Sequence, residues 1–400
     1  MCAGVVQLVN DRRELEEIVT WVDRVLEHAV ELRASDIHFE RSDEGFSIRL
    51  RVDGVFRSQS APRSALAQGV LSRIKVLAHC NIAENQQPQE GVIRRECCGH
   101  SVEFRVSVLP TPFGESVVLR VLDGLHEAWE LEALGMDDAT REKLNHLFEA
   151  RHGLFLVTGP TGSGKTTTLY SILRSMNNPS KKLITAEDPV ECVLPGVTQV
   201  AVHHRLGFGF GEALRAFLRH DPDVILVGEI RDPETARVAV QASLTGHWVM
   251  STLHTACAPS AIPRLMDLGL EPQLVAASLS GVLAQRLVRR ICDACRATMV
   301  LDDAVKNTFR ASGIELQAFY GKGCPICEGE GYRGRSAIFE WMPMSDELRS
   351  LTLSRVPLPT LRRCAIEEGM QELLDDGVRA VMNGVTTIDE IMLVSGRDSC

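Results

Sequence analysis

The sequence predicts an α/β fold in which a doubly wound parallel sheet follows a small α+β N-terminal domain. Four short apolar segments are spaced as buried parallel strands with helical stretches between them, at residues 154–158, 183–186, 224–227 and 248–252. The first part of the chain instead has segments that alternate apolar and polar residues, which is typical of an antiparallel sheet with one solvated face. A cysteine- and glycine-rich stretch begins near Ile291, and residues 335–400 are expected to be helical.

The N-terminal region combines an amphipathic helix with short strands. Leu15, Ile18, Val22 and Leu26 lie at helical spacing, so they predict one apolar stripe that packs on a core. In the segment FSIRLRV alternate residues are apolar, and Asp53-Gly54 after it is a strong hairpin signal. A polar, acidic segment at about 123–132 is the best candidate for a linker between this region and the parallel sheet.

The stretch GPTGSGKTTT, residues 159–168, fits the pattern G-x-x-x-x-G-K-[ST] of a phosphate-binding loop. It stands between an apolar strand and a predicted helix, and this context distinguishes a phosphate site from a glycine-rich turn. Glycines allow backbone N–H groups to approach the phosphates, and the helix N-terminus adds a positive dipole end. We predict that a nucleoside triphosphate binds here, with Lys165 on the β- and γ-phosphates and the Thr166 hydroxyl on Mg²⁺. The predicted nucleotide-binding residues of the loop are Gly159, Pro160, Thr161, Gly162, Ser163, Gly164, Lys165, Thr166 and Thr167.

Acidic residues end two of the predicted strands, at the edge where open α/β sheets bind ligands. Glu229 follows the strand 224–227, and Glu187 and Asp188 follow the strand 183–186. A phosphate-binding loop needs such a carboxylate to hold magnesium or to orient water. One acid at a strand end could simply cap the next helix, but two such clusters favour a catalytic role. His254 follows the strand 248–252, and we predict that it senses the γ-phosphate, although a lone histidine is more often structural.

Two Cys-x₂-Cys pairs, Cys292 with Cys295 and Cys324 with Cys327, flank residues 296–323. Two such pairs suit a tetrahedral Cys₄ zinc site in which each pair supplies one edge. The alternative is two redox-active or incidental pairs. We predict a zinc site, which would hold together an otherwise loose part of the chain.

Composition is ordinary for a globular protein, with 44% apolar and 24% charged residues in 400. The net charge of −10 argues against a dedicated nucleic-acid binder. The sequence lacks an apolar stretch long enough to span a bilayer, and its N-terminus does not match a secretory signal. Because no export signal accompanies the twelve cysteines, a cytoplasmic protein is expected.

Taken together, the motifs resemble the secretion ATPase superfamily that serves type II secretion and type IV pilus assembly. The four boxes of this superfamily correspond to GPTGSGKTTT, ITAEDPVE, LRHDPDVILVGEIRD and GHWVMSTLHT. Further matches are ASDIHFE, RIKVLAHCNIAENQQPQEG and FRVSVLPTPFGESVVLRVLD before the core, and SLSGVLAQRLVRRIC and IEEGMQELLDDGV after it. The resemblance therefore spans nearly the whole chain.

The resemblance implies an ATP hydrolase with a RecA-like P-loop core. It implies four parts: an arginine-bearing α+β domain (1–125), the ATPase core (126–290), a tetracysteine zinc-binding subdomain (291–334) and a helical C-terminal subdomain (335–400). Glu229 would be the Walker B acid, Glu187 and Asp188 the acids of the aspartate box, and His247 and His254 the histidine box. The resemblance also implies arginines that face the phosphates, namely Arg105, Arg120, Arg215, Arg219 and Arg231, joined by either Arg333 or Arg335.

By the same resemblance, we expect a homo-hexamer that powers type II secretion at the cytoplasmic face of the inner membrane, with type IV pilus assembly as the alternative. Its partners would be an inner-membrane platform protein and the cytoplasmic domain of a membrane assembly protein, not nucleic acid. We expect the chain to depart from the family at its start, where a docking module would be absent or abbreviated, and at Trp248, Ala256 and Cys257.

Three rivals remain at this point. A pilus retraction ATPase is disfavoured because retraction members usually lack the paired Cys-x₂-Cys motifs. A nucleic-acid translocase with the same core is disfavoured by the acidic net charge. A subunit that binds nucleotide without hydrolysing it would be excluded by measured ATP turnover.

Overall fold

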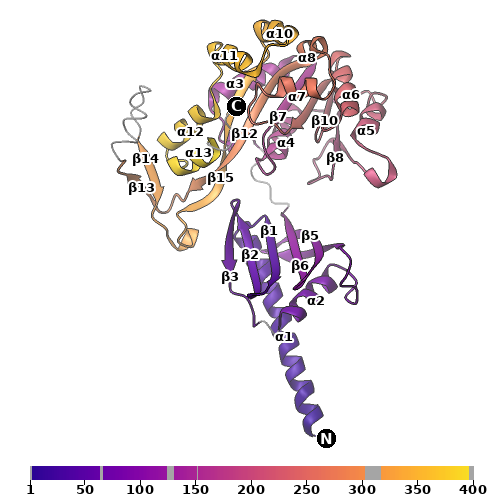
Figure 1. Ribbon diagram of the computed structural model, residues 1–400, viewed down its shortest axis with the longest axis vertical. Helices are drawn as coiled ribbons and strands as arrows, with labels where there is room; N and C mark the ends of the chain where they lie inside the picture. The colour runs from indigo at the N-terminus through magenta and orange to yellow at the C-terminus, as the bar shows by residue number, and fades with distance from the viewer. Residues whose placement is uncertain (1, 64–65, 124–129, 151, 302–316, 396–400) are drawn as a thin grey trace. The chain divides into compact units, whose positions relative to one another are not determined.

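The chain folds as two compact units, Met1–His126 and Glu127–Cys400. The computed structural model in Figure 1 describes residues 2–63, 66–123, 130–150, 152–301 and 317–395. Most of the expected linker at about 123–132 lies outside the described residues. Each unit is considered by itself below.

Unit 1 is an antiparallel sheet with two helices on one face. The sheet order is β3-β2-β1-β6-β5-β4. The strands are β1 (Asp36–Ser42), β2 (Gly45–Val52), β3 (Val55–Gln59), β4 (Gln89–Cys97), β5 (His100–Thr111) and β6 (Gly114–Asp123), and the helices are α1 (Cys2–Glu31) and α2 (Ala67–Leu77). Asp53 and Gly54 have φ of 52° and 85° and close the β2–β3 hairpin, as the Asp-Gly pair predicts.

The core of unit 1 follows from the two-residue period of its strands. Ile37, Phe39 and Leu50 are fully buried, and they cluster with Leu26 of α1 and Leu71 of α2. Their polar neighbours along each strand point to the other face of the sheet, because successive side chains alternate between faces. The expected α+β arrangement is confirmed.

Unit 2 contains a seven-stranded sheet of order β15-β12-β7-β11-β10-β8-β9. Its strands are β7 (Gly153–Thr158), β8 (Leu183–Glu187), β9 (Val197–Ala201), β10 (Val224–Val227), β11 (Trp248–Leu253), β12 (Leu279–Ile291) and β15 (Tyr332–Pro343). All neighbouring pairs are parallel except β12 with β15. The four strands predicted from the sequence are present and parallel, and the fold class is confirmed.

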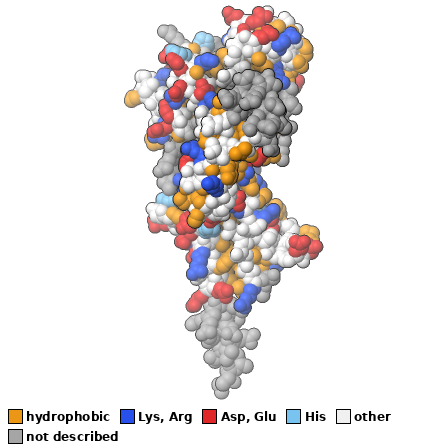
Figure 2. Space-filling view, turned by 90° about the vertical axis from the view of Figure 1, so that its left-hand side faces the viewer, with side chains coloured by type: hydrophobic (Ala, Val, Ile, Leu, Met, Phe, Trp, Pro, Cys, Tyr) orange, Lys and Arg blue, Asp and Glu red, His pale blue; other side chains and the backbone are white. Residues whose placement is uncertain are grey.

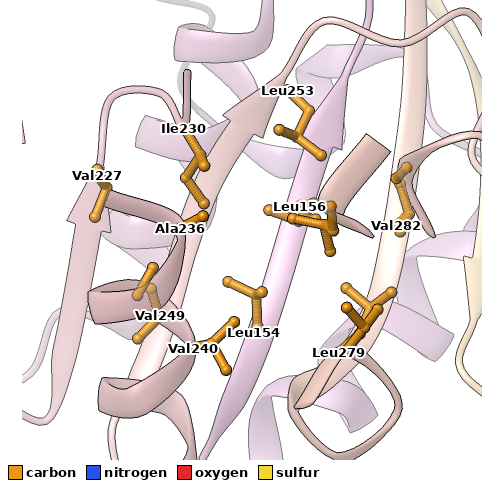
Figure 3. Packing of buried hydrophobic residues seen from close by; sticks show 14 of the residues in the cluster. Leu154, Leu156, Val227, Ile230, Ala236, Val240, Val249, Leu253, Leu279 and Val282 are labelled. Atoms are coloured by element: carbon orange, nitrogen blue, oxygen red, sulfur yellow. The ribbon is translucent and has the colours of Figure 1, made fainter. Parts of the chain in front are cut away.

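Helices cover both faces of this sheet, as a doubly wound fold requires. Leu154 and Leu156 of β7 cluster with α6, whereas Phe155 and Val157 belong to the cluster that includes α4. Figure 3 shows the first of these layers, with Val240 of α6 beside Leu154. The elements that flank the strands are η2 (Leu131–Leu134), α3 (Asp138–Glu149), α4 (Lys165–Met176), η3 (His204–Leu206), α5 (Phe210–Phe217), α6 (Pro233–Leu244), α7 (Ala261–Asp267) and α8 (Pro272–Ser278).

The expectation that residues 335–400 are helical was wrong at their beginning. Tyr332–Pro343 forms β15, which pairs with β12 from Gly281↔Pro343 to Ile291↔Tyr332. Residues Ala337–Trp341 are all buried, and all except Glu340 are apolar. Such a short run is compatible with a helix or a strand until a pairing partner is known. Helices follow it, at α10 (Asp346–Leu353), α11 (Leu358–Glu367), α12 (Leu373–Met382) and α13 (Ile388–Ser395).

The surface shows charges of both signs. On the face in Figure 2, acidic and basic side chains are interspersed with hydrophobic ones. Among the described residues, none of the helices is both long and apolar enough to cross a membrane.

A buried ion pair ties α2 to β6 within unit 1. Lys75 Nζ lies 2.7 Å from Glu115 Oε1 and also donates to the carbonyl of Glu84 at 2.6 Å. The Lys75 and Glu115 side chains are only 1% and 6% exposed. Removing one partner of such a pair leaves an uncompensated buried charge.

We expect Lys75→Met to lower the free energy of unfolding of unit 1 by about 3–5 kcal/mol, because Glu115 would keep its charge without a partner. The matched control is Arg94→Met, whose pair with Glu103 is exposed on the arginine side and should contribute less than about 1 kcal/mol. Urea denaturation followed by circular dichroism would measure both. Equal losses in the two variants would contradict the importance of the buried pair.

Candidate functional site

The phosphate-loop sequence occupies the turn between β7 and α4. Gly159 has φ 151° and Gly164 has φ 85°, conformations that side chains rarely adopt. A Cβ on Gly159 would lie 2.5 Å from the carbonyl oxygen of Gln285, and a Cβ on Gly164 would lie 2.9 Å from Gln285 Nε2. Both glycines are therefore required by close packing against β12 as well as by their backbone conformation.

Polar groups inside this loop fit an anionic ligand. Lys165 Nζ donates to the carbonyls of Gly159 and Pro160, each at 2.8 Å, so the ammonium is folded over the loop. The Ser163 hydroxyl is buried and has no hydrogen-bond partner within the described part of the chain. Thr166 and Thr167 follow, half-buried, in the first turn of α4. An orphaned hydroxyl, a lysine and a helix N-terminus are the groups that bind phosphate.

The charge state of Lys165 reflects its surroundings. Burial lowers the pKa of its ammonium to about 8, Glu229 opposes this fall, and Arg286 and Arg231 add to it. The lysine thus shares one electrostatic environment with residues from two other segments, the loop after β10 and strand β12.

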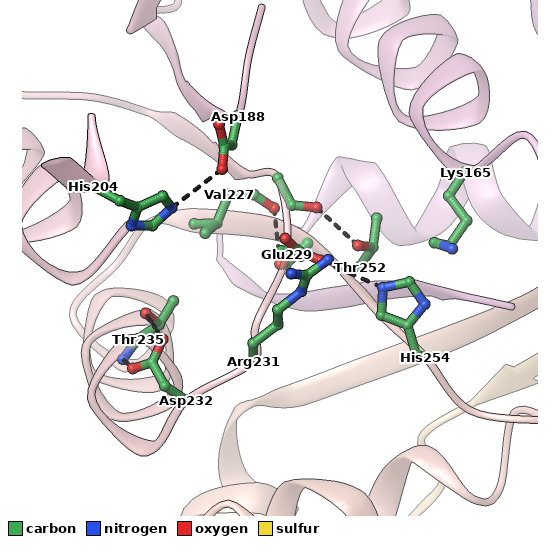
Figure 4. A network of polar contacts seen from close by, with 12 residues as sticks. Lys165, Asp188, His204, Val227, Glu229, Arg231, Asp232, Thr235, Thr252 and His254 are labelled. Carbon is green, nitrogen blue, oxygen red and sulfur yellow. Dashed lines mark hydrogen bonds and ion pairs between the residues drawn. The ribbon is translucent and has the colours of Figure 1, made fainter. Parts of the chain in front are cut away.

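Glu229, Arg231 and His254 come together at the carboxyl edge of the sheet, facing Lys165 (Figure 4). Arg231 Nε lies 2.5 Å from Glu229 Oε2, and His254 Nε2 lies 3.4 Å from the same oxygen. Glu229 is 17% exposed, whereas Arg231 is 70% exposed. The structure therefore gathers the acid, the histidine and one arginine that the sequence singled out.

Glu187 is buried and does not face solvent. Its carboxylate accepts hydrogen bonds from Tyr170, from Thr185 at 2.5 Å and from Gln199 at 3.0 Å, and the residue is only 4% exposed. Burial, together with the bond to Glu187, raises the pKa of the Tyr170 hydroxyl. In this conformation Glu187 connects α4, β8 and β9.

Asp188 meets His204, whose Nε2 lies 3.1 Å from the Asp188 carboxylate (Figure 4). Both side chains are largely exposed. His247, the other histidine of the expected box, precedes β11 and bonds to the carbonyl of Ala242 at 3.0 Å. It therefore lies at the opposite end of the strand from His254.

The remaining predicted arginines are dispersed. Arg215 of α5 pairs with Glu212 at 3.1 Å and with Glu234 at 2.5 Å, and Arg219 donates to the carbonyl of Arg215. These bonds hold Arg215 on α5 and Arg219 just beyond the end of that helix. Arg333 and Arg335 are exposed on β15, and no contact given by the structure chooses between them.

Arg105 and Arg120 belong to unit 1, where they stand directly opposite each other on β5 and β6. Arg120 Nε lies 3.3 Å from Asp36, and Arg105 Nε lies 3.9 Å from Glu103. The two arginines share the polar face of their sheet, and Arg120 is 70% exposed.

Sequence reasoning missed three residues beside the phosphate loop: Tyr170, Gln285 and Arg286. Tyr170 is placed among the apolar positions of a helix, where it looks like core. Gln285 and Arg286 interrupt the apolar strand LSGVLAQRLVRRI. Two adjacent polar residues in a strand that is otherwise apolar were the feature of the sequence that could have indicated their role. Polar groups inside a strand that is buried need partners, so they could have been flagged.

The four cysteines of the predicted zinc site form one cluster. Their sulfur atoms all lie within 4.8 Å of one another. Sγ–Sγ distances are 3.8 Å for Cys292–Cys324, 3.9 Å for Cys295–Cys327 and 3.7 Å for Cys324–Cys327. A tetrahedron with Zn–S bonds of about 2.3 Å has edges of ~3.8 Å, so the geometry fits Zn²⁺.

Backbone groups complete the cysteine cluster. Burial alone would raise the pKa of the Cys327 thiol, but backbone N–H groups of Cys324 and Gly331 donate to it and bring its pKa down to about 6. The cluster lies where β12 ends, beside the small sheet of β13 (Arg296–Met299) and β14 (Ala318–Gly321) and the turn η4 (Pro325–Cys327). Four clustered cysteine sulfurs at these separations are the ligand set that Zn²⁺ prefers.

Comparison with known proteins decides the family. Residues 11–393 match the family described as type II/IV secretion system protein. The chain belongs to this family. The type II secretion system protein HxcR of Pseudomonas aeruginosa is 44% identical over 385 residues, which are 96% of this chain and 79% of that protein. The type IV pilus assembly ATPase PilB of Myxococcus xanthus is 44% identical over 380 residues, which are 94% of this chain and 67% of that protein.

A solved structure agrees with this family. The pilus retraction motor PilT with bound ADP is 28% identical, with a TM-score of 0.62, and the match covers 93% of this chain and 96% of that one. The resemblance stated from the motifs and the expected enzyme class, an ATP hydrolase of the secretion and pilus-assembly kind, are both confirmed.

Proposed function

We propose that this secretion ATPase powers type II secretion by assembling a pseudopilus, as a homo-hexamer at the cytoplasmic face of the inner membrane. The observation that supports it most is the convergence of Glu229, Arg231 and His254 opposite Lys165 of the phosphate loop. Relatives with this architecture include the type II secretion protein HxcR. Its partners would be an inner-membrane platform protein and the cytoplasmic domain of a membrane assembly protein.

The residues divide the work of hydrolysis. Lys165 would leave the Gly159 and Pro160 carbonyls for the β- and γ-phosphates, and Ser163 would donate its free hydroxyl. Thr166 would hold Mg²⁺, which neutralises charge on the phosphates. Glu229 orients the attacking water, and His254 connects that carboxylate with the γ-phosphate. The Glu187 carboxylate already accepts hydrogen bonds from three donors. Glu187 would therefore support this arrangement structurally.

In this proposal, closure of the two units would bring further arginines to the nucleotide. Arg231 already contacts Glu229, whereas Arg105 and Arg120 lie on the polar face of the unit 1 sheet. Arg105 and Arg120 stand directly opposite each other on paired strands, so their like charges repel. A phosphate bound between or above them would make this arrangement favourable. Arg215 on α5 and Arg219 just beyond the end of that helix would serve a nucleotide. Closing and opening would convert hydrolysis into motion.

A second candidate, type IV pilus assembly, is favoured by the equal identity to PilB. The site chemistry would be the same, because both functions use ATP-driven motion. The genes that neighbour this one would separate the two: a secretin with pseudopilins indicates secretion, and pilins with a retraction ATPase indicate pilus assembly.

We expect Glu229→Gln to lower kcat for ATP by about 10²–10⁴-fold, because the neutral amide cannot orient water as a base. Binding of ATP and the sedimentation of the ring should be preserved. The matched control is Glu271→Gln, which removes the same charge from an exposed pair with Arg355. Steady-state phosphate release would measure both variants. A fully active Glu229→Gln protein would sink the catalytic assignment.

Nucleotide affinity should weaken as pH rises above about 8. Free Lys165 loses its proton near that pH, whereas a bound phosphate keeps the ammonium charged, so binding takes up a proton. The dissociation constant for ADP, measured between pH 7 and pH 9.5, should then be flat below about 8 and rise toward tenfold per pH unit above it. Lys165→Arg stays charged throughout and should show a flatter profile. Parallel profiles would contradict this role of Lys165.

Purified protein should contain about one zinc per chain, held by the four cysteines. Cys292→Ser combined with Cys327→Ser should lose the metal and destabilise the end of β12, whereas Cys192→Ser, outside the cluster, should keep it. Metal analysis and thermal denaturation would report both effects. A protein that is metal-free as purified and normally stable would refute the site.

A further inference from the structure

The loop after β11 is tethered to three strands in succession. We call residues 254–260 the edge loop, because it follows His254 along the carboxyl edge of the sheet. The Thr255 N–H donates to the Thr158 hydroxyl at 2.9 Å, and the Ala258 N–H donates to Glu340 at 2.7 Å. Between them, the carbonyl of Ala256 accepts from Arg286 Nη2 at 2.6 Å. These partners belong to β7, β15 and β12, which are neighbours in the sheet.

Arg286 occupies the position between the edge loop and the phosphate loop. The residue is 4% exposed, and its Nη1 donates to the carbonyl of Gln285 at 3.0 Å. That carbonyl and Nη1 are the groups that a Cβ on Gly159 would meet, at 2.5 Å and 3.1 Å. One guanidinium therefore lies against the first glycine of the phosphate loop while it holds the loop that carries His254.

Gln285 fixes the phosphate loop from the same strand. Its side chain donates to the carbonyl of Ser163 at 2.7 Å and accepts from the Thr168 hydroxyl at 2.6 Å. With 1% of its surface exposed, this amide is shielded from solvent. β12 consequently presents two consecutive residues, one that holds the phosphate loop and one that reaches from it to the edge loop.

We propose that Arg286 is a positioning residue that keeps His254 beside Glu229 by holding the carbonyl of Ala256. His254 Nε2 is 3.4 Å from Glu229, and only Thr255 separates His254 from Ala256, so release of that carbonyl removes one of the three tethers of the loop that carries the histidine. A shift of Gly159 when a nucleotide binds is passed to His254 through the same guanidinium. The inference rests on the proposed ATPase site and adds to it a residue that the motif boxes do not include.

The test is a double-mutant cycle between Arg286 and His254 in the full-length protein. Arg286→Lys keeps the charge, but one ammonium cannot replace a fork whose two ends reach Gln285 and Ala256. We expect kcat to fall about tenfold while the dissociation constant for ADP changes less than about threefold. We expect His254→Gln to lower kcat by a similar factor. The kcat of the double variant should be within about twofold of that of the worse single variant, because both changes disrupt the same Arg286–His254 coupling.

Arg289→Lys is the matched control. Arg289 lies on the same strand, is 22% exposed, and pairs with Glu390 at 2.7 Å in the C-terminal helix α13. Its variant should keep the wild-type kcat, and its effect should add to that of His254→Gln. Thermal denaturation of all variants would establish that each is folded.

The proposal is overturned by a wild-type kcat in Arg286→Lys, or by a double variant whose loss is the product of the two single losses. A wild-type protein that hydrolyses no ATP would instead refute the proposed function. The failures are distinguishable, because the cycle is interpreted only against measured wild-type turnover. A large loss of ADP affinity in Arg286→Lys would also overturn it, since Arg286 would then act on the nucleotide directly.

Discussion

The architecture of unit 2 depends on the close approach of the phosphate loop to the backbone of β12. A side chain at Gly159 would sit 2.5 Å from the Gln285 carbonyl, so the loop can exist only with glycine there. This contact fixes the loop before any ligand arrives, because Gln285 also bonds to Ser163 and Thr168. A preformed loop avoids the entropic cost of ordering backbone N–H groups around the phosphates. The same strand then supplies Arg286 on one side and ends at the cysteine cluster on the other.

The charge around Lys165 is positive, whereas the net charge of the whole chain is negative. The full sequence carries a net charge of −10, yet Lys165, Arg231 and Arg286 gather around a single Glu229. Burial of Lys165 lowers the pKa of its ammonium, and Arg286 and Arg231 add to this fall. An anionic phosphate opposes this fall, so the site gains more from its ligand than an exposed basic patch would. Net charge indicates the class of partner poorly when the relevant charges are few and buried.

The proposed ATP-driven motion requires elements that respond together, and several such elements are joined within unit 2. The edge loop is bound to β7, β12 and β15, and its first residue, His254, contacts the acid that ends β10. Packed strands are poorly deformable, so displacement at the phosphate loop is transmitted rather than absorbed. β15, most of which falls in the segment 335–400 that we expected to be helical, is one of the strands that anchor this loop, through Glu340.

The sequence alone determined whatever is local: the apolar runs of the parallel strands, the Asp53-Gly54 turn, the phosphate loop with its following helix, and the two cysteine pairs. It also placed Glu229 and His254 at the same edge of the sheet, because parallel strands end at one edge, and the two side chains do lie together there. Tertiary structure decided what depends on distant pairs. Gln285 meets Thr168 across 117 residues of chain, and Tyr170 with Gln199 buries the carboxylate of Glu187. Periodicity reports which side chains share a face, but it carries no information about which distant segment will satisfy a buried polar group.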